Sequence, residues 1–409
     1  MTDVEKKYIE NVLVIGGGYV GLPLALLASK NSFSTYIYDN NDEKCSLLKK
    51  GISHIDEIHD LALKGSLENG SLKIISKSQI NDSKYKDVFD VIVICVPTPL
   101  SENREPDLSM ITNACSQAIK LIKPSTLLIL ESSTYPGTTK KVVLPILKEK
   151  FAELSDQDLL LAHSPERIDP GNMKWTNDNT PRIFAGLNEK SAKRTRDFYS
   201  RLGIPLVEVS TLEIAEAAKL FENTFRLVNI SLVNEFANTM RNIGIDPNEI
   251  LNAAYTKPFG IMPFQISAGI GGHCIPVDPY YLTWWANREG EKLSIVESAQ
   301  HVNENMYKVS MRRIKNILSE EISGKRVLLA GITYKPGVLD VRETPALDLW
   351  NALENAGCNV RWWDPLVQTW GNREKLSEEN FPLDLIVIVT PVDLPRNLSE
   401  KVPVLDLSK

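Results

Sequence analysis

The sequence predicts an α/β protein in which two doubly wound domains are joined by a central all-α domain with a long helix. Three observations predict this class. Short apolar runs alternate with helical segments up to about residue 200, a stretch of helical spacing without glycine or proline follows, and the alternation then begins again. From these changes of pattern we place the domains at residues 1–205, 206–320 and 321–409.

The first domain is expected to begin with a βαβ unit. A β-branched run at 11–15 meets a glycine cluster, an apolar helix is predicted at 23–30, and a second strand at 35–39. Later strands are predicted at 91–96, 127–130 and 159–162, with helical segments between them. Strands and helices that alternate in this way form a parallel sheet covered by helices on both faces.

The central domain is expected to be built on long helices. One helix is predicted over residues 210–242, where apolar residues recur at helical spacing, and a second over 294–319. We expect the apolar face of the first of these to pack against a partner subunit. The last domain is expected to contain a strand at 325–331, a helix at 347–356, and strands at 360–363 and 385–390.

Composition bounds the class of partner. The 409 residues are 43% hydrophobic and carry a net charge of -6, which disfavours nucleic acid because phosphate binding usually needs a basic face. No signal peptide is predicted, and no apolar run approaches the ~18 residues of a membrane span. The five cysteines are scattered and lack CxxC spacing, which favours free thiols in the cytoplasm and suggests no metal site.

A glycine loop follows the first strand and opens the first helix. The segment GGGYVG at residues 16–21 has GxGxxG spacing, and Asp39 ends the next strand. In this arrangement the glycines admit a pyrophosphate, while the aspartate binds a ribose diol and repels a 2′-phosphate. The pattern favours NAD as the cofactor of a Rossmann-like domain; the alternative is a glycine turn whose aspartate only caps a helix. Lys44 is interpreted as a solvated helix residue.

Polar residues follow three later strands of the same domain. They are Thr98 in VPTP, Thr134 in ESSTYPG and Glu166 in HSPER. Ligands bind beyond the carboxyl ends of parallel strands, so the three segments can line one crevice. Taken singly, each is more typical of an ordinary turn, because proline, serine and glycine are common turn residues.

Cys274 lies in the glycine-rich segment AGIGGHCIPVDP at residues 268–279. Glycines let a ligand approach the backbone, and N–H dipoles or a nearby cation can activate a thiol. The alternative is a buried cysteine that acts as a small apolar residue. Asp278, which precedes a proline, also fits a helix N-cap. On the long helix Lys219 and Asn223 share a face, although Lys219 equally fits the edge of an apolar stripe.

Seven ordered motifs, which span nearly the whole chain, resemble those of the nucleotide-sugar 6-dehydrogenases, the UDP-glucose and GDP-mannose dehydrogenase superfamily. They are GGGYVGLP (16–23), CVPTP (95–99), ESSTYPGTT (131–139), SPER (164–167), AKLFENTFR (218–226), GGHCIPVDP (271–279) and GITYKPGVLDVR (331–342). The resemblance implies an NAD-binding domain, a central helical dimerisation domain and a C-terminal UDP-sugar-binding, Rossmann-like domain. It implies a four-electron oxidation of a sugar C6 hydroxymethyl group to a carboxylate, with two NAD reduced per sugar.

The resemblance also implies the roles of the matching residues. Cys274 is expected to be the nucleophile, while Lys219 and Asn223 stabilise the C6 oxygen. Asp278 is expected to assist proton transfer. The set is completed by Thr134 and Glu166, which are expected to hold a water, with Glu166 or Asp278 as the base.

Further contacts are implied for cofactor and substrate. Cofactor contacts are expected from Gly16, Gly18, Tyr19, Val20, Gly21, Asp39, Thr98, Thr134 and Arg342. Substrate contacts are expected from Glu166, Arg167, Lys219, Asn223, Lys257, Phe264, Gly271 and Lys335. Lys257 is the candidate substitute for an arginine that reaches across the dimer in UDP-glucose enzymes, and a homodimer through the central helix is expected.

The substrate branch is indicated by the residues around Cys274. Val277 stands where UDP-glucose and GDP-mannose enzymes usually carry a lysine, and His273 precedes the cysteine. With the runs REPDLS (104–109) and KPFGIMPF (257–264), this pattern resembles the branch that acts on UDP-N-acetylhexosamines in polysaccharide biosynthesis. UDP-N-acetyl-D-glucosamine is the expected substrate. UDP-N-acetylmannosamine, UDP-N-acetylgalactosamine and UDP-glucose stay open, because QISAG (265–269) replaces an expected proline-rich segment.

Two other functions are compatible with parts of the sequence. A two-electron dehydrogenase of the 6-phosphogluconate or hydroxyisobutyrate type also has a dinucleotide-binding domain, long helices and a catalytic lysine. Such an enzyme needs neither Cys274 nor a second α/β domain. A non-catalytic NAD-binding scaffold or sensor is the other alternative, and the complete set of expected catalytic residues argues against it.

Overall fold

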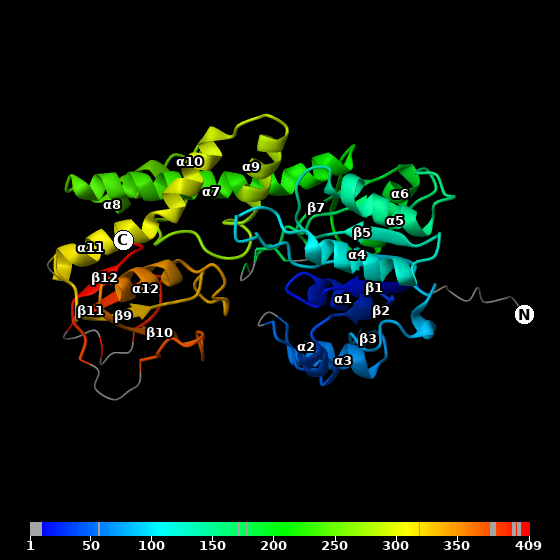
Figure 1. The fold of residues 1–409 in the computed structure, drawn as a ribbon, viewed down its shortest axis with the longest axis horizontal. Helices are drawn as coiled ribbons and strands as arrows, with labels where there is room; N and C mark the ends of the chain where they lie inside the picture. The colour runs from blue at the N-terminus through cyan, green and yellow to red at the C-terminus, as the bar shows by residue number, and fades with distance from the viewer. Residues whose placement is uncertain are drawn as a thin grey trace, which may run out of the picture. The chain divides into compact units, whose positions relative to one another are not determined.

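The computed structural model describes residues 10–55, 58–169, 172, 174–176, 178–318, 320–376, 382–394, 398 and 402–409. The chain divides into two compact units, residues 1–221 and 222–409. The boundary between them falls inside one long helix, α7 (Leu212–Asn242), which Figure 1 shows without interruption. Each unit contains one sheet in its described part.

Unit 1 contains an eight-stranded sheet with the strand order β3-β2-β1-β4-β5-β6-β7-β8. Its strands are β1 (Asn11–Ile15), β2 (Ser34–Tyr38), β3 (Leu72–Ile75), β4 (Val91–Ile94), β5 (Leu127–Leu130), β6 (Leu161–His163), β7 (Arg182–Gly186) and β8 (Leu206–Glu208). Its helices are α1 (Gly21–Lys30), α2 (Asp42–Lys49), α3 (Asp60–Glu68), α4 (Ser109–Leu121), α5 (Leu144–Lys150) and α6 (Glu189–Arg201), with a 3-10 turn at Ser83–Tyr85 and a π-helical turn, η2, at Thr139–Val143.

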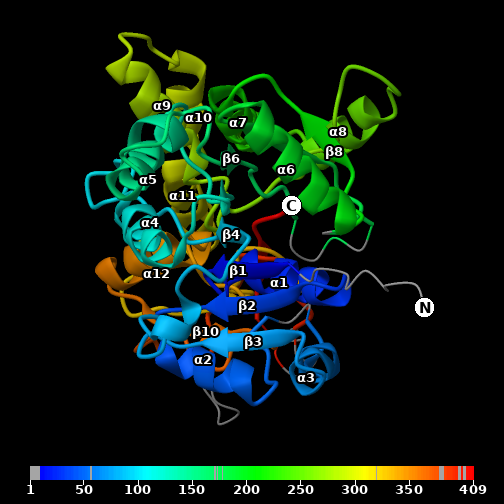
Figure 2. The same ribbon diagram turned by 90° about the vertical axis from the view of Figure 1, so that its right-hand side faces the viewer.

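Strand β1 pairs in parallel with both β2 and β4, and Figure 2 shows β4, β1, β2 and β3 side by side in this order. Successive strands are therefore added on one side of β1 up to β3, and on its other side from β4 onwards. Sheets of this kind bind ligands at the position where this order changes, between β1 and β4.

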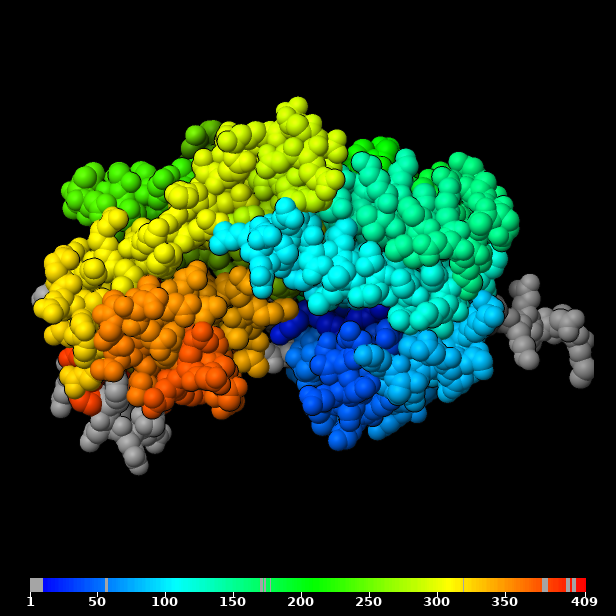
Figure 3. Space-filling view, in the orientation of Figure 1, coloured from blue at the N-terminus to red at the C-terminus, as the bar shows by residue number. Residues whose placement is uncertain are grey.

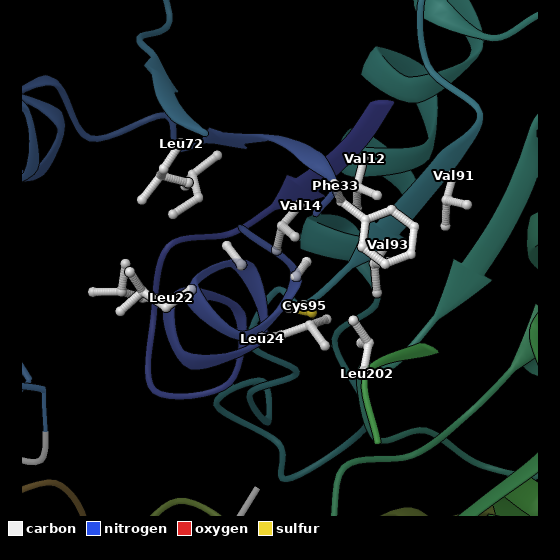
Figure 4. Close-up of a cluster of buried hydrophobic side chains, with 14 of the residues drawn as sticks. Val12, Val14, Leu22, Leu24, Phe33, Leu72, Val91, Val93, Cys95 and Leu202 are labelled. Atoms are coloured by element: carbon white, nitrogen blue, oxygen red, sulfur yellow. The ribbon is translucent and has the colours of Figure 1, made fainter. Parts of the chain in front are cut away.

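Alternating side chains of the strands fill two separate cores. Val12 and Val14 of β1 contribute to one core, with residues of α1, α3 and α6, whereas Leu13 and Ile15 contribute to the other, with residues of α4 and α5. Figure 4 shows the first core, where Leu22 and Leu24 of α1 lie near the valines of β1 and β4. Because both faces of the sheet are buried, the central strands are apolar throughout rather than alternating.

Unit 2 contains the rest of α7 and a four-stranded parallel sheet with the order β10-β9-β11-β12. Its strands are β9 (Arg326–Ala330), β10 (Asn359–Trp363), β11 (Leu385–Ile388) and β12 (Val404–Asp406). Its other helices are α8 (Pro247–Tyr255), α9 (Asp278–Arg288), α10 (Ser294–Glu304), α11 (Met306–Leu318) and α12 (Pro345–Asn355). Figure 3 shows α10 and α11, in yellow, at the surface of this unit.

The core of unit 2 lies between its sheet and two helices. Val327 and Leu329 of β9 pack with Ile314 of α11 and with Leu349 and Leu353 of α12. The sheet and its helices confirm the predicted second Rossmann-like region, and the long helix confirms the predicted all-α centre. No helix in the described part of the chain has both the length and the apolar composition to cross a membrane.

One prediction about the elements is wrong. The second long helix, predicted over 294–319, is two helices that meet at Asn305, and Ser319 lies outside the described residues. At this position the His301 carbonyl oxygen accepts hydrogen bonds from both the Asn305 N–H, at 3.3 Å, and the Asn305 side-chain amide, at 2.7 Å, so the side chain shares an acceptor of the helical backbone where α10 ends. The large sheet of the predicted doubly wound domain contains one antiparallel pair, β6 with β7.

Candidate active site

The glycine loop of unit 1 has the shape of a dinucleotide-binding turn. Gly16 has a φ of +103°, and a Cβ there would lie 2.4 Å from the carbonyl oxygen of Cys95. A Cβ on Gly21 would lie 1.9 Å from the Gly16 carbonyl oxygen, so only glycine lets α1 start this close to β1. A Cβ on Gly18 would meet nothing within 4 Å, which leaves room for a pyrophosphate at the start of α1. The loop therefore fits NAD.

Asp39 lies directly after β2 and holds the glycine loop in place. One carboxylate oxygen accepts hydrogen bonds from the Gly17 N–H and from Lys44 Nζ, both at 2.9 Å, and the other accepts from the Asn41 N–H at 2.9 Å. Burial raises the pKa of Asp39, but these hydrogen bonds outweigh it, and the pKa lies below its usual value. Lys44 lies on α2 (Asp42–Lys49) as predicted, but its side chain is only 27% exposed and forms this ion pair.

The other expected cofactor residues of unit 1 lie at the same edge of the sheet. Tyr19 and Val20 are half-buried between the glycine loop and the core beside α1. Thr98 is half-buried in the loop after β4. Thr134 lies in the loop after β5, is buried, and donates its hydroxyl hydrogen bond to Thr138 Oγ1 at 2.7 Å. Since β4 and β5 are parallel neighbours, these loops emerge at one edge.

Glu166 follows β6 and lies in the electrostatic field of two cations. Burial raises the pKa of its carboxyl group, while Lys219 and Arg182 lower it, and the net pKa lies above the ordinary value. Its carboxylate accepts a hydrogen bond from the Ile168 N–H. Arg167, next in the chain, donates to the carbonyl oxygen of Pro181 at 2.8 Å.

A buried ion pair beside this site was not expected from the sequence. The Glu131 carboxylate, at the end of β5, accepts from Arg182 and from the Tyr199 hydroxyl, the latter at 2.5 Å, and the Cys95 thiol lies 3.6 Å from it. The partners come from β7, α6 and β4, so no local pattern relates them. Only an unusual arginine in the apolar run that becomes β7 hints at the pair.

In unit 2 the structure brings Asn223 and Asp278 together. Asp278 is buried at the start of α9, and its carboxylate accepts a hydrogen bond from Asn223 Nδ2 at 2.5 Å. The Asp278 N–H also donates to the carbonyl oxygen of Cys274 at 2.8 Å. Cys274 itself is half-buried, whereas the other four cysteines of the chain are buried. Among the cysteines, Cys274 is therefore the one that a ligand can reach.

The glycines before Cys274 let its turn pack against the segment after β9. A Cβ on Gly271 would lie 2.6 Å from the Glu343 carbonyl oxygen, and a Cβ on Gly272 would lie 3.0 Å from the Tyr334 ring. The Gly272 N–H donates to the carbonyl oxygen of Arg342 at 3.2 Å. The close approach of these backbones explains why this turn needs glycine.

Arg342 forms an ion pair next to this turn. Its guanidinium donates to both carboxylate oxygens of Asp340, with the shortest distance at 2.6 Å, and Asp340 is buried. His273 Nδ1 lies 3.8 Å from the same carboxylate. Asp340 was not identified from the sequence, although it lies in one of the quoted motifs.

A cavity of about 1130 Å³ lies within unit 2. Phe264, Gly271 and Lys335 are among the residues that line it, as are Arg226 and Arg241. A cavity of this size, with apolar walls and a few cationic side chains, suits a large anionic ligand. Lys257 is exposed, lies 4.8 Å from the ring centre of Phe259, and does not belong to this lining.

The expected residues thus form separate groups within the two units. Unit 1 gathers the glycine loop with Asp39, and places Glu166 in the field of Lys219. Unit 2 gathers Asn223, Cys274 and Asp278, and its cavity is lined in part by Gly271 and Ile275, which lie on either side of Cys274 in the sequence. In the described residues no group of three or more histidine, cysteine, aspartate or glutamate side chains could hold a metal ion.

Three sequence profiles match successive parts of the chain. Residues 10–203 match the NAD binding domain of the UDP-glucose/GDP-mannose dehydrogenase family, residues 213–305 match its central domain, and residues 328–402 match its UDP binding domain. The three matches follow one another along the chain and together cover most of it.

Individual relatives are similar over nearly their whole length. The UDP-N-acetyl-D-glucosamine 6-dehydrogenase of Pseudomonas aeruginosa is 35% identical over 94% of this chain and 87% of its own. Protein CapL of Staphylococcus aureus is 34% identical over 92% of this chain and 86% of its own. A solved structure of UDP-D-ManNAc dehydrogenase from Pyrococcus horikoshii has a TM-score of 0.83 at 32% identity and covers 93% of this chain and 89% of its own.

Proposed function

The chain belongs to the UDP-glucose/GDP-mannose dehydrogenase family, and from this premise we propose that it oxidises C6 of a UDP-N-acetylhexosamine to a carboxylate through a thioester on Cys274. It is an NAD-dependent nucleotide-sugar dehydrogenase. The observation that carries the proposal is the half-buried Cys274, whose carbonyl oxygen accepts from the N–H of Asp278, itself held by Asn223 at 2.5 Å. A half-buried thiol four residues before a buried aspartate suits covalent catalysis.

The overall reaction removes four electrons, and a cysteine is needed for its second half. When bound, NAD accepts a hydride from the substrate in each of the two oxidations. An aldehyde carbon is a poor hydride donor until a nucleophile adds to it, and the Cys274 thiolate supplies that nucleophile. The new C–S bond makes a thiohemiacetal, loss of the second hydride makes a thioester, and water cleaves the C–S bond to release the carboxylate and the free thiol.

The charged residues of the proposed site stabilise oxygen and move protons. Lys219 and Asn223 bind the C6 oxygen, and the lysine offsets the negative charge that grows on it. Asp278 assists proton transfer. Thr134 and Glu166 hold the hydrolytic water. The raised pKa of Glu166 brings this carboxyl closer to neutral pH, which suits a general base or acid.

The substrate contacts follow from the cavity of unit 2 and the polar loops. Phe264, Gly271 and Lys335 line the cavity, and we assign them to the nucleotide sugar. Arg167 is assigned to the sugar. Lys257, outside the lining, is assigned to a partner subunit's substrate. Arg342, now paired with Asp340, is assigned to the cofactor.

The sugar is proposed to be UDP-N-acetyl-D-glucosamine. Val277 and His273 beside Cys274, and the 35% identity to an enzyme of that name, support this choice. An NADH assay across UDP-glucose and the three UDP-N-acetylhexosamines tests it. We expect about two NADH per UDP-N-acetyl-D-glucosamine. A higher kcat/KM for another sugar overturns the substrate assignment, and one NADH per sugar with an aldehyde or ketone product overturns the four-electron reaction.

We predict that Cys274→Ala lowers the rate of uronate formation by about a thousandfold or more, because no other group in the proposed site supplies the thiolate. NAD binding, measured by fluorescence titration, is expected to stay as in the wild type. Cys358→Ala, a buried cysteine of the same unit, is the control and keeps its turnover. Full uronate production by Cys274→Ala would refute the covalent mechanism.

Three further features belong to this proposal. The enzyme acts as a homodimer through the central helix α7, works in the cytoplasm, and has domains at residues 1–205, 206–320 and 321–409. Exposed apolar side chains on α7, among them Phe221 and Leu232, support the dimer. Four buried free thiols support a reducing compartment.

A further inference from the structure

Glu216 is a fully buried carboxylate to which the proposed reaction gives no role. It lies on α7, and its two oxygens accept three hydrogen bonds from the start of η2, after β5. One oxygen accepts from the Gly137 N–H at 2.5 Å. The other accepts from the Thr139 N–H at 2.7 Å and from the Thr139 hydroxyl at 2.6 Å. The carboxylate thus satisfies backbone donors that a helix start leaves unpaired.

A carboxylate is a costly choice for a position that only needs a helix cap. Burial raises the pKa of Glu216 to about 7, although the hydrogen bonds from Thr139 and Gly137 oppose the rise. Serine or aspartate at the helix start itself would cap with a short local bond. Here the cap comes from another helix, 77 residues later in the chain. The interaction therefore fixes two distant segments to each other.

The first of these segments carries Thr134. The Thr134 hydroxyl donates to Thr138 Oγ1 at 2.7 Å, and the Thr138 hydroxyl donates to the Tyr135 carbonyl oxygen at 2.9 Å. Glu216 binds the residues on both sides of Thr138, namely Gly137 and Thr139. Since Thr138 is the partner of Thr134, a shift of the Glu216 carboxylate moves the Thr134 hydroxyl.

The second segment carries Lys219. Lys219 follows Glu216 by three residues on α7, so the two side chains share one face of the helix. Lys219 is also a cation whose field lowers the pKa of Glu166. The Glu216 carboxylate therefore links the turn of α7 that carries Lys219 to the loop that carries Thr134.

We propose that Glu216 is a positioning residue, which locks the Thr134 loop to the turn of α7 that presents Lys219. Glu216 contacts no reacting atom and acts through these two residues. This inference rests on the proposed function, because it assumes the roles given there to Thr134 and Lys219. The physical requirement is that both oxygens accept hydrogen bonds at once.

Glu216→Gln tests this requirement with nearly the same shape. A glutamine has a single acceptor oxygen, so its NH2 group must face the N–H of Gly137 or of Thr139, and two donors repel each other. Displacement of a catalytic group by about 1 Å lowers a rate by about a hundredfold, so we expect kcat to fall by about ten- to a hundredfold. The dissociation constant for NAD, measured by fluorescence, is expected to change much less than kcat, because Thr134 is one of several cofactor contacts and the glycine loop is untouched.

Glu213→Gln is the matched control, because Glu213 lies one turn earlier on α7, is half-buried, and makes none of these hydrogen bonds. It is expected to keep the wild-type kcat. Thr139→Val is a milder second variant that removes one donor to Glu216 and leaves both backbone donors. We expect it to lower kcat by about three- to tenfold, in keeping with the loss of one hydrogen bond.

The outcomes separate the two levels of the argument. All variants are assayed at 25 °C, with the folded fraction measured by circular dichroism. If the wild type makes two NADH per sugar but folded Glu216→Gln matches Glu213→Gln, the positioning role is wrong. It is also wrong if the kcat of Glu216→Gln or Thr139→Val falls only in proportion to the folded fraction. If the wild type oxidises none of the UDP-sugars, the proposed function itself fails.

Discussion

In unit 1 the burial of a single residue decides its protonation state as well as its packing. His163, at the end of β6, is fully buried, and burial lowers its pKa from 6.5 to about 3. The Thr139 hydroxyl lies in hydrogen-bond range of its ring, 3.4 Å from Nδ1. A histidine in such a place stays neutral throughout the physiological range.

This burial predicts a pH dependence of stability. Below pH 6.5 the unfolded chain takes up a proton at His163, whereas the folded protein does so only near pH 3. The stability from this residue is therefore lost as the pH falls from 6.5 toward 3, at up to about 1.4 kcal/mol per pH unit. Glu216, whose pKa is raised to about 7, acts in the opposite direction, since its stabilisation is lost as the pH rises.

We predict that His163→Gln flattens this acid limb, because glutamine does not titrate. Free energies of unfolding from urea titrations at pH 4 to 7 measure it, as the difference between the variant and the wild type at each pH. The variant is expected to be less stable than the wild type at pH 7 and to lose less stability on acidification. Parallel curves for both proteins would show that His163 takes up its proton equally in the folded and unfolded states.

At the scale of elements, the turns at strand ends decide what the sheet can bind. The turn from β1 into α1 needs glycine at residues 16 and 21 because backbone atoms lie where a Cβ would be. Gly18 has no such neighbour, so its lack of a side chain serves a ligand rather than the fold. Gly21 and Gly18 of one motif are thus required for different physical reasons, the first for the fold and the second for the ligand.

Two alanine variants, one at each glycine, distinguish the role in folding from the role in NAD binding. Gly21→Ala forces a backbone shift and is predicted to destabilise the protein by about 1–3 kcal/mol, besides weakening NAD binding. Gly18→Ala is predicted to leave the thermal unfolding temperature almost unchanged while it raises the dissociation constant for NAD by about tenfold or more. Thermal unfolding and NAD titration measure both. Unchanged NAD affinity in Gly18→Ala would mean that the pyrophosphate does not approach this residue.

At the scale of the whole molecule, α7 is the element that both units share. The division at residues 221 and 222 falls between Lys219 and Asn223, which are one helical turn apart. Leu232, further along α7 in unit 2, is 61% exposed. An apolar side chain this exposed on a long helix suits the dimer surface that we propose.

The dimer predicts the effect of a charge on α7. Leu232→Glu would bury an unpaired carboxylate in the subunit contact, which costs about 3–5 kcal/mol and weakens association by more than about a hundredfold. Sedimentation velocity is expected to show a dimer for the wild type and a monomer for the variant. Ile295→Glu, a change on exposed α10, is the control and stays dimeric. A monomeric wild type would contradict the proposed dimer.

The sequence by itself determined the class of the fold and the order of its parts. Apolar runs with alternating or helical spacing identify strands and helices, because these periods decide which side chains reach a core. Local motifs identified the glycine loop with Asp39, and Cys274 with Asp278, since their residues are close along the chain. The same local reasoning failed at Asn305, where two helices meet within a continuous helical pattern.

Only the tertiary structure decided which distant residues meet. Glu131 and Arg182 come from strands 51 residues apart, and Glu216 reaches back 77 residues to Thr139. Each of these pairs contains a buried charge, and its partner is determined by the fold rather than by the spacing along the chain. The fold pairs them because a charge in a core is tolerated only where hydrogen bonds or an opposite charge replace water, and no period along the chain encodes where that replacement will come from.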